Sequence, residues 1–163
     1  MRVLRSLPIA FLLMATTVKA EMGLTVEGFV THWYSLFDSN APVEEFLKVL
    51  ANEELEVILP EATLRSHQDF KNWYSGIQER IKTASHEVIS FDYFRFKDHW
   101  RVNLDVIWRA TEYSGKQHYL RTDQIWDIHL KPSGYIISKY IVNVKNGGQE
   151  NYPPNACQLK KSL

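Results

Sequence analysis

The hydrophobic periodicity of this chain changes once, near Ile81, and that change limits the folds available to it. Upstream of Ile81, apolar residues recur at helical spacing and predict three helices, over residues 25–37, 42–50 and 66–81. Downstream, apolar and polar residues alternate, as in strands with one buried face. The alternating segments are residues 88–97, 100–111, 118–130 and 135–144. The chain therefore places its helices first and a set of strands after them.

The turns between these strands are short and indicate how the strands pair. Lys97–His99, Tyr113–Lys116 and Lys131–Gly134 are polar segments with turn-forming residues. Connections of this length join neighbours that run in opposite directions, so the strands should form an antiparallel meander. The prediction is an α+β fold with the N-terminal helices packed on one face of the sheet. Alternate residues from Trp100 to Trp108 are apolar and should face the helices, and a short strand is expected over residues 55–59.

The N-terminus has the layout of a secretory signal peptide. Arg2 and Arg5 precede an apolar run, and Val18-Lys19-Ala20 places small residues where a signal peptidase reads them. We expect cleavage after Ala20 and export to a periplasmic or extracellular location, with no membrane contact after cleavage. The predicted organisation is a signal peptide over residues 1–20, one α+β domain over 21–145, and a polar tail over 146–163.

Composition excludes several classes of partner and cofactor. The chain carries 19 Lys and Arg against 19 Asp and Glu. Three of the basic residues lie in the predicted signal peptide, so the mature domain should be slightly acidic, which argues against nucleic acid as a partner. Cys157 is the single cysteine, and the six histidines form no pair with metal-ligand spacing. We therefore expect no metal site and no cofactor.

At several points the sequence resembles the nuclear transport factor 2-like superfamily, which includes SnoaL-type polyketide cyclases, ketosteroid isomerases and scytalone dehydratase. The residues that carry the resemblance are Leu59-Pro60-Glu61, Ser66, Phe70, Trp73-Tyr74, Trp108-Arg109, Gly115 and Trp126. The resemblance implies a cystatin-like cone, in which a curved antiparallel sheet wraps a long helix and leaves an open mouth. It also implies a homodimer through the outer face of the sheet. Phe91 and Tyr93 are interpreted as exposed aromatics on that outer face.

A cone of this kind is a pocket for a small molecule, and its lining can be predicted from the inward faces of the helices and strands. The expected pocket-lining residues are Trp33, Tyr34, Phe37, Trp73, Trp108, Gln124 and Trp126. A histidine beside a carboxylate in such a pocket would form an acid/base pair able to move protons next to a carbonyl. Asp38 with either His67 or His118 is the pair that the sequence suggests, although each residue also fits a turn or an exposed surface position.

Three functions remain open at this level. The domain could bind a small apolar or amphipathic molecule in the cone without catalysis, which the lack of a matching catalytic set favours. It could be a cofactor-free lyase, isomerase or cyclase that uses a histidine–carboxylate pair. It could also be an accessory domain that binds another protein through its outer face. The sequence does not identify the ligand.

Overall fold

The computed structural model describes residues 25–145. The predicted signal peptide, the polar tail and Cys157 lie outside the described residues. The elements are α1 (Val26–Asp38), α2 (Val43–Leu47), β1 (Glu56–Ile58), β2 (Thr63–Leu64), α3 (His67–Arg80), β3 (Ile81–Arg95), β4 (Trp100–Glu112), β5 (Gln117–Lys131) and β6 (Gly134–Val144). None of these helices is long and apolar enough to cross a membrane.

The helix boundaries follow from capping. Thr25 accepts a hydrogen bond from the backbone N–H of Gly28 (3.0 Å) at the start of α1, and Ser66 accepts one from Asp69 (3.1 Å) at the start of α3. Both helices therefore begin where the capping residues predict. The chain then passes from α3 directly into β3 at Ile81, so this strand begins earlier than the predicted residue 88.

The sheet has six strands in the order β2-β1-β6-β5-β4-β3. The antiparallel meander β3 to β6 is confirmed, and so are its short turns. Two features were not predicted: β2 adds an edge strand, and β1 pairs with β6 in parallel. With three and two residues, β1 and β2 are too short to show an alternating pattern of their own.

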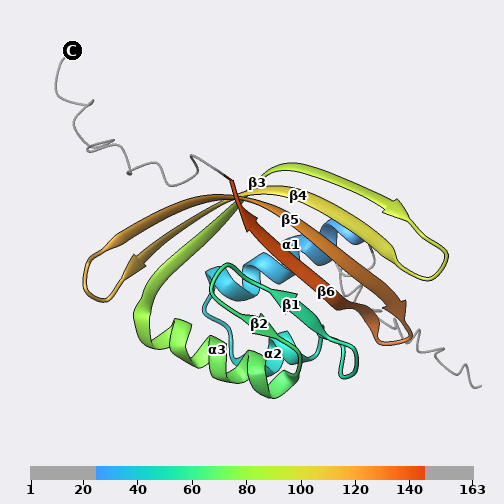
Figure 1. Cartoon of the computed structure of the whole chain (residues 1–163), viewed down its shortest axis with the longest axis horizontal. Helices are drawn as coiled ribbons and strands as arrows, with labels where there is room; N and C mark the ends of the chain where they lie inside the picture. The colour runs from blue at the N-terminus through green and yellow to red at the C-terminus, as the bar shows by residue number, and fades with distance from the viewer. Residues whose placement is uncertain (1–24, 146–163) are drawn as a thin grey trace, which may run out of the picture.

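The long strands arch over α1 (Figure 1), so the sheet has a concave face that the helix enters. β3 departs from regular register between Ile81 and Thr83 and again between Val88 and Ser90. Such bulges bend a strand and increase its twist, which contributes to the arch. α3 and α2 lie below the end of the sheet at which β3 begins (Figure 1), opposite the arch of the strands.

The second bulge corrects the interpretation of Phe91 and Tyr93. Because Ile89 is an extra residue in β3, the alternation reverses after it, and Phe91 pairs with Leu104 and Tyr93 with Val102 on the concave face. Phe91 packs against the buried core. The aromatic residues that β3 and its turn present to the outer face are Phe94 and Phe96 instead.

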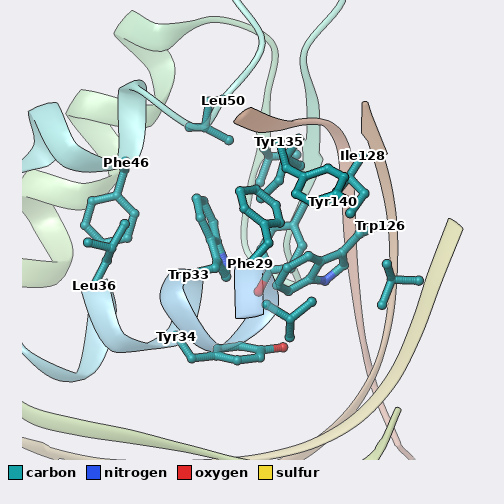
Figure 2. Close-up of a cluster of buried hydrophobic side chains, with 14 of the residues drawn as sticks. Phe29, Trp33, Tyr34, Leu36, Phe46, Leu50, Trp126, Ile128, Tyr135 and Tyr140 are labelled. Atoms are coloured by element: carbon teal, nitrogen blue, oxygen red, sulfur yellow. The ribbon is translucent and has the colours of Figure 1, made fainter. Parts of the chain in front are cut away.

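The core lies between α1 and the concave face of the sheet. Trp33 of α1 is fully buried and makes edge-to-face contacts with Phe46, Trp126 and Tyr140, at ring-centroid distances of 5.4, 6.0 and 5.7 Å. In Figure 2, Trp33 stands between Phe46 on one side and Tyr140 and Trp126 on the other. This aromatic cluster fixes α1 in the arch of the sheet.

The outer face of the sheet is covered by ion pairs instead of helices. Arg121 and Lys145 bind the Asp105 carboxylate at 2.6 and 2.9 Å, and Arg109 binds Glu87 at 2.8 Å. The hydrogen bond from Arg121 is the main cause that lowers the pKa of Asp105 to about 2. Asp105 and Arg109 therefore both lie on the outer face, and each has a different partner.

Candidate active site

A cavity of about 590 Å³ opens beyond the C-terminal end of α1, between α3 and the concave face of β3, β4 and β5. This volume is within the range of small-molecule sites, roughly 300–1,000 Å³. Much of its wall is apolar and includes Trp73 and Ile77 of α3, and Trp108 and Leu120 of the sheet. The cavity exists because α1 stops at Asp38, so the sheet beyond that point has no helix in its arch.

A histidine–aspartate pair lies on the wall of this cavity. His86 Nδ1 is 2.6 Å from Asp38 Oδ1, and the His86 backbone N–H donates to Asp38 Oδ2 (3.2 Å). Asp38 is the last residue of α1, and His86 lies on the concave face of β3, where it pairs with Trp108 of β4. The carboxylate therefore contacts both the ring and the backbone of one residue, which fixes the imidazole orientation. His86 Nε2 forms no hydrogen bond with a described residue, so this atom is available to a bound molecule.

The turn after α1 holds Asp38 in place. Asn40 adopts a left-handed backbone conformation (φ 53°), which asparagine tolerates better than most residues. Its side-chain oxygen accepts hydrogen bonds from Gln78 (3.2 Å) and Tyr74 (3.4 Å) of α3. The end of α1 is thereby tied to α3 across the cavity.

The ring of His86 is supported from the core. Tyr34 stacks on it with a centroid distance of 4.8 Å and an interplanar angle of 24°. The Tyr34 hydroxyl donates to Gln124 Oε1 (2.8 Å), which also accepts from Trp126 (3.2 Å). Burial raises the pKa of Tyr34 well above its ordinary value, so the hydroxyl stays protonated and continues to donate. The buried network thus holds the aromatic surface on which the imidazole rests.

A second histidine–carboxylate pair lies at the rim of the cavity. His118 Nε2 is 2.7 Å from Glu112 Oε1, and Ser114 donates to the other oxygen of Glu112 (2.9 Å). The hydrogen bond from His118 is the main cause that lowers the pKa of Glu112. The His118 ring lies 5.8 Å from Trp108, so both pairs border the same tryptophan.

The structure separates the three predicted catalytic residues. Asp38 and His118 both line the cavity, but the carboxylate partner of His118 is Glu112 and not Asp38. His67 is not part of the cavity wall; its ring contacts the backbone oxygen of Leu50 at 3.3 Å. The predicted pairing of Asp38 with His67 or His118 is therefore wrong, because β3 brings His86 to Asp38 first.

The predicted lining residues divide into two groups. Phe37, Trp73, Trp108 and Gln124 are on the cavity wall. Trp33, Tyr34 and Trp126 lie in the core beside it, where α1 fills the arch of the sheet. Their positions on inward faces were predicted correctly, but they pack between α1 and the sheet and do not line the cavity.

His86 was not predicted because the first long strand, β3, was expected to begin only at Val88, whereas it begins at Ile81. The signal was present: extending the same alternation back from Val88 places His86 on the concave face. Among residues 25–145 no three His, Cys, Asp or Glu side chains come together as a metal site.

Of the comparisons with known proteins, only the comparison with solved structures identifies the fold. No family model matches the sequence, and no curated protein matches it. A protein from Novosphingobium aromaticivorans, provisionally assigned as an aromatic ring hydroxylase, superposes with a TM-score of 0.69 at 11% identity, covering 74% of this chain and 87% of that one. A second protein from the same organism, provisionally assigned as a scytalone dehydratase, gives 0.67 at 14% identity, with 74% and 82% covered.

A nuclear transport factor 2-like superfamily protein from Salmonella enterica serovar Typhimurium gives a TM-score of 0.65 at 13% identity, covering 76% of this chain and 92% of that one. A further match, from Caulobacter vibrioides, is described as having a cystatin-like fold. The arrangement of α1, α3 and the arched sheet thus recurs in these proteins at full domain length. The described domain therefore has a cystatin-like cone fold, which it shares with this nuclear transport factor 2-like superfamily protein.

Proposed function

We propose that this protein is an enzyme that removes a proton from a carbon acid, as a lyase or isomerase, with His86 as the base. The observation that supports this most directly is the 2.6 Å contact between His86 Nδ1 and Asp38 Oδ1 on the wall of the cavity. A fold of this kind hosts many functions, so the proposal rests on the site and not on the fold.

The geometry assigns a role to each member of the pair. With the Nδ1 proton donated to Asp38, the lone pair of neutral imidazole is on Nε2. Nε2 would accept the proton from a substrate carbon, and Asp38 would stabilise the imidazolium that forms. The proton could then return to a different carbon, which is an isomerisation. Alternatively, a leaving group could depart from the adjacent carbon, which is an elimination.

The apolar surroundings of His86 would assist proton transfer. The apolar wall made by Trp73, Trp108 and Leu120 would exclude water from a bound substrate and strengthen the electrostatic interaction between imidazolium and carboxylate. One structural match is provisionally assigned as a dehydratase, and loss of water from a carbon skeleton is an elimination. This reaction, as proposed, needs only the side chains named.

The test is solvent exchange. Ketones of suitable size, such as 2-tetralone, would be incubated with the protein in D₂O and followed by mass spectrometry. His86→Gln should reduce deuterium incorporation by about 10²–10⁴-fold, and Asp38→Asn should reduce it as well. His32→Gln is the matched control, because His32 is an exposed residue of α1 outside the cavity wall.

The second candidate, binding without catalysis, is favoured by the same apolar wall. It predicts ketones that bind in the cavity but acquire no deuterium above the uncatalysed rate, with no effect of His86→Gln. That result would contradict the proposed enzyme. Export through a signal peptide cut after Ala20 and pairing of two copies through the outer face remain proposals from the sequence, testable by N-terminal sequencing and analytical ultracentrifugation.

A further inference from the structure

Three cationic side chains lie on the rim of the cavity. Arg80 ends α3, Lys82 follows it at the start of β3, and Lys116 lies in the turn between β4 and β5. The backbone oxygen of Arg80 accepts a hydrogen bond from Tyr113 N–H (3.0 Å), which joins the end of α3 to that turn. The three cations therefore come from two parts of the chain, the α3–β3 junction and the β4–β5 turn, which the fold brings to one opening.

These three cations differ in their ion pairing from the cations on the outer face of the sheet. Among the described residues, none of the three is in an ion pair with a carboxylate. On the outer face, five cations each bind a carboxylate at 2.6–2.9 Å: Arg101, Arg109, Arg121, Lys139 and Lys145. The positive charge at the rim is thus held in no direct ion pair with a described residue, and Lys116 acts on Glu112 only through its charge, which helps to lower the pKa of that carboxyl.

The acidic groups of the cavity are already engaged. Each of its three described carboxylates contacts a ring nitrogen: Asp38 with His86 (2.6 Å), Glu61 with Trp73 (3.0 Å) and Glu112 with His118 (2.7 Å). Each of these carboxylates therefore already has a partner within the cavity, whereas the three cations are in no ion pair with a described residue.

We propose that the substrate carries one anionic group, a carboxylate, sulfonate or phosphate, which binds at Arg80, Lys82 and Lys116. This inference rests on the proposed function, because it takes the bound molecule to be a substrate. Lys82 lies four residues before His86 on β3. Four residues of a strand span about 13 Å. The anion would thus lie roughly that far from the carbon that loses its proton, with the apolar body between them on Trp108.

The experiment compares two fluorescent probes that share an aromatic body. 1-Anilinonaphthalene-8-sulfonate carries an anionic group, and N-phenyl-1-naphthylamine lacks it. At low salt, Arg80→Gln combined with Lys116→Gln should weaken binding of the sulfonate about fivefold to thirtyfold and change binding of the neutral probe by less than about twofold. Added NaCl should weaken binding of the sulfonate but not binding of the neutral probe. Trp108→Ala should weaken both probes, which locates them in the cavity.

The matched control removes two exposed charges elsewhere. Lys71 in α3 and Lys97 in the β3–β4 turn are exposed and are not on the cavity wall. Lys71→Gln combined with Lys97→Gln should leave both affinities unchanged. Equal weakening by the control, or sulfonate binding that ignores the rim variant, would overturn the inference. Circular dichroism of each variant checks that it is folded.

This outcome is independent of the proton-transfer chemistry. Neither probe is a ketone, so their affinities report binding in the cavity and not proton transfer at His86. A protein that selects the sulfonate but shows no His86-dependent exchange would be an anion-binding carrier. A protein that shows the exchange but no preference for the sulfonate would retain the proposed function and lose this inference.

Discussion

The two ends of the concave face are built from the same strands but differ in what covers them. At the closed end, Val102 of β4 and Trp126 and Ile128 of β5 are fully buried. At the open end, Trp108 of β4 and Leu120 of β5 are only partly covered. The strands continue unchanged between the ends, whereas α1 stops at Asp38. The length of one helix therefore decides where the sheet is core and where it is a site.

Polar groups follow the same division. Gln124 lies at the boundary of the two ends and bonds Tyr34, Trp126 and Thr122, so its amide is satisfied within the core. At the open end, Nε2 of His86 and the rim cations have no described partner. Satisfied polar groups stabilise a core, and unsatisfied ones at an opening are what a ligand can use.

Replacing one tryptophan at each end by alanine should give the largest difference in stability between the two ends. Trp126→Ala should lower the free energy of unfolding by about 3–5 kcal/mol, because it leaves a cavity among packed rings. Trp108→Ala should cost only about 1 kcal/mol or less, since its ring already borders an open cavity. Urea unfolding of both variants measures the difference, and equal losses would show that the open end is packed like the core.

The hydrogen bonds that join Gln124, Tyr34 and Trp126 should give the next largest change in the free energy of unfolding. Gln124→Leu should cost about 2–3 kcal/mol, because it leaves the Tyr34 hydroxyl and the Trp126 N–H without an acceptor. Tyr34→Phe alone should cost about 1 kcal/mol. In a double-mutant cycle the two losses should be less than additive, whereas strict additivity would indicate that the hydrogen bond does not form.

The ion pairs of Asp105 on the outer face serve as a reference, because substitutions at either end of the concave face should not affect them. Folding lowers the pKa of Asp105 to about 2, chiefly through its hydrogen bond from Arg121, against about 3.9 in an unfolded chain. The ionised form therefore stabilises the fold above about pH 4, and this contribution, about 1–2 kcal/mol, is lost as the pH falls toward 2. Asp105→Asn should remove this part of the acid dependence, as measured by denaturation at pH 2, 3 and 5.

The smallest effect is expected at an exposed ion pair of the same face. Arg109 binds Glu87 at 2.8 Å, and their side chains are 34% and 53% exposed. Arg109→Ala should change stability by less than about 1 kcal/mol, and less still in high salt. A larger loss that salt does not reduce would mean that the Arg109 side chain contributes mainly through packing, for example on Tyr119 (5.4 Å).

The fold was predictable because its signals are local and repeated. The helical stripe of α1, the caps at Thr25 and Ser66, and the turn at Gly115, whose φ of 88° suits glycine, each act within a few residues. The inward position of Trp108 and Trp126 followed from simple alternation, and the pairing of β4 with β5 agrees with it.

The site was less predictable because it depends on register and on where one helix stops. A bulge at Ile89 reversed the faces of Phe91 and Tyr93, and nothing in the local sequence requires a bulge there. The pairing of Asp38 with His86 joins residues 48 positions apart. Asp38 was identified as a candidate because it ends α1, but its partner could be found only by extending β3 back to Ile81 and knowing where α1 lies on the sheet.

The tautomer of His86 tests the account most directly. In protein with ¹⁵N-labelled histidine, at a pH where the ring is neutral, long-range proton–nitrogen spectra distinguish the protonated ring nitrogen from the free one. The account predicts a proton on Nδ1, held by Asp38, and a bare Nε2 facing the cavity, with this preference lost in Asp38→Asn. A proton on Nε2, or a spectrum that Asp38→Asn does not change, would contradict it.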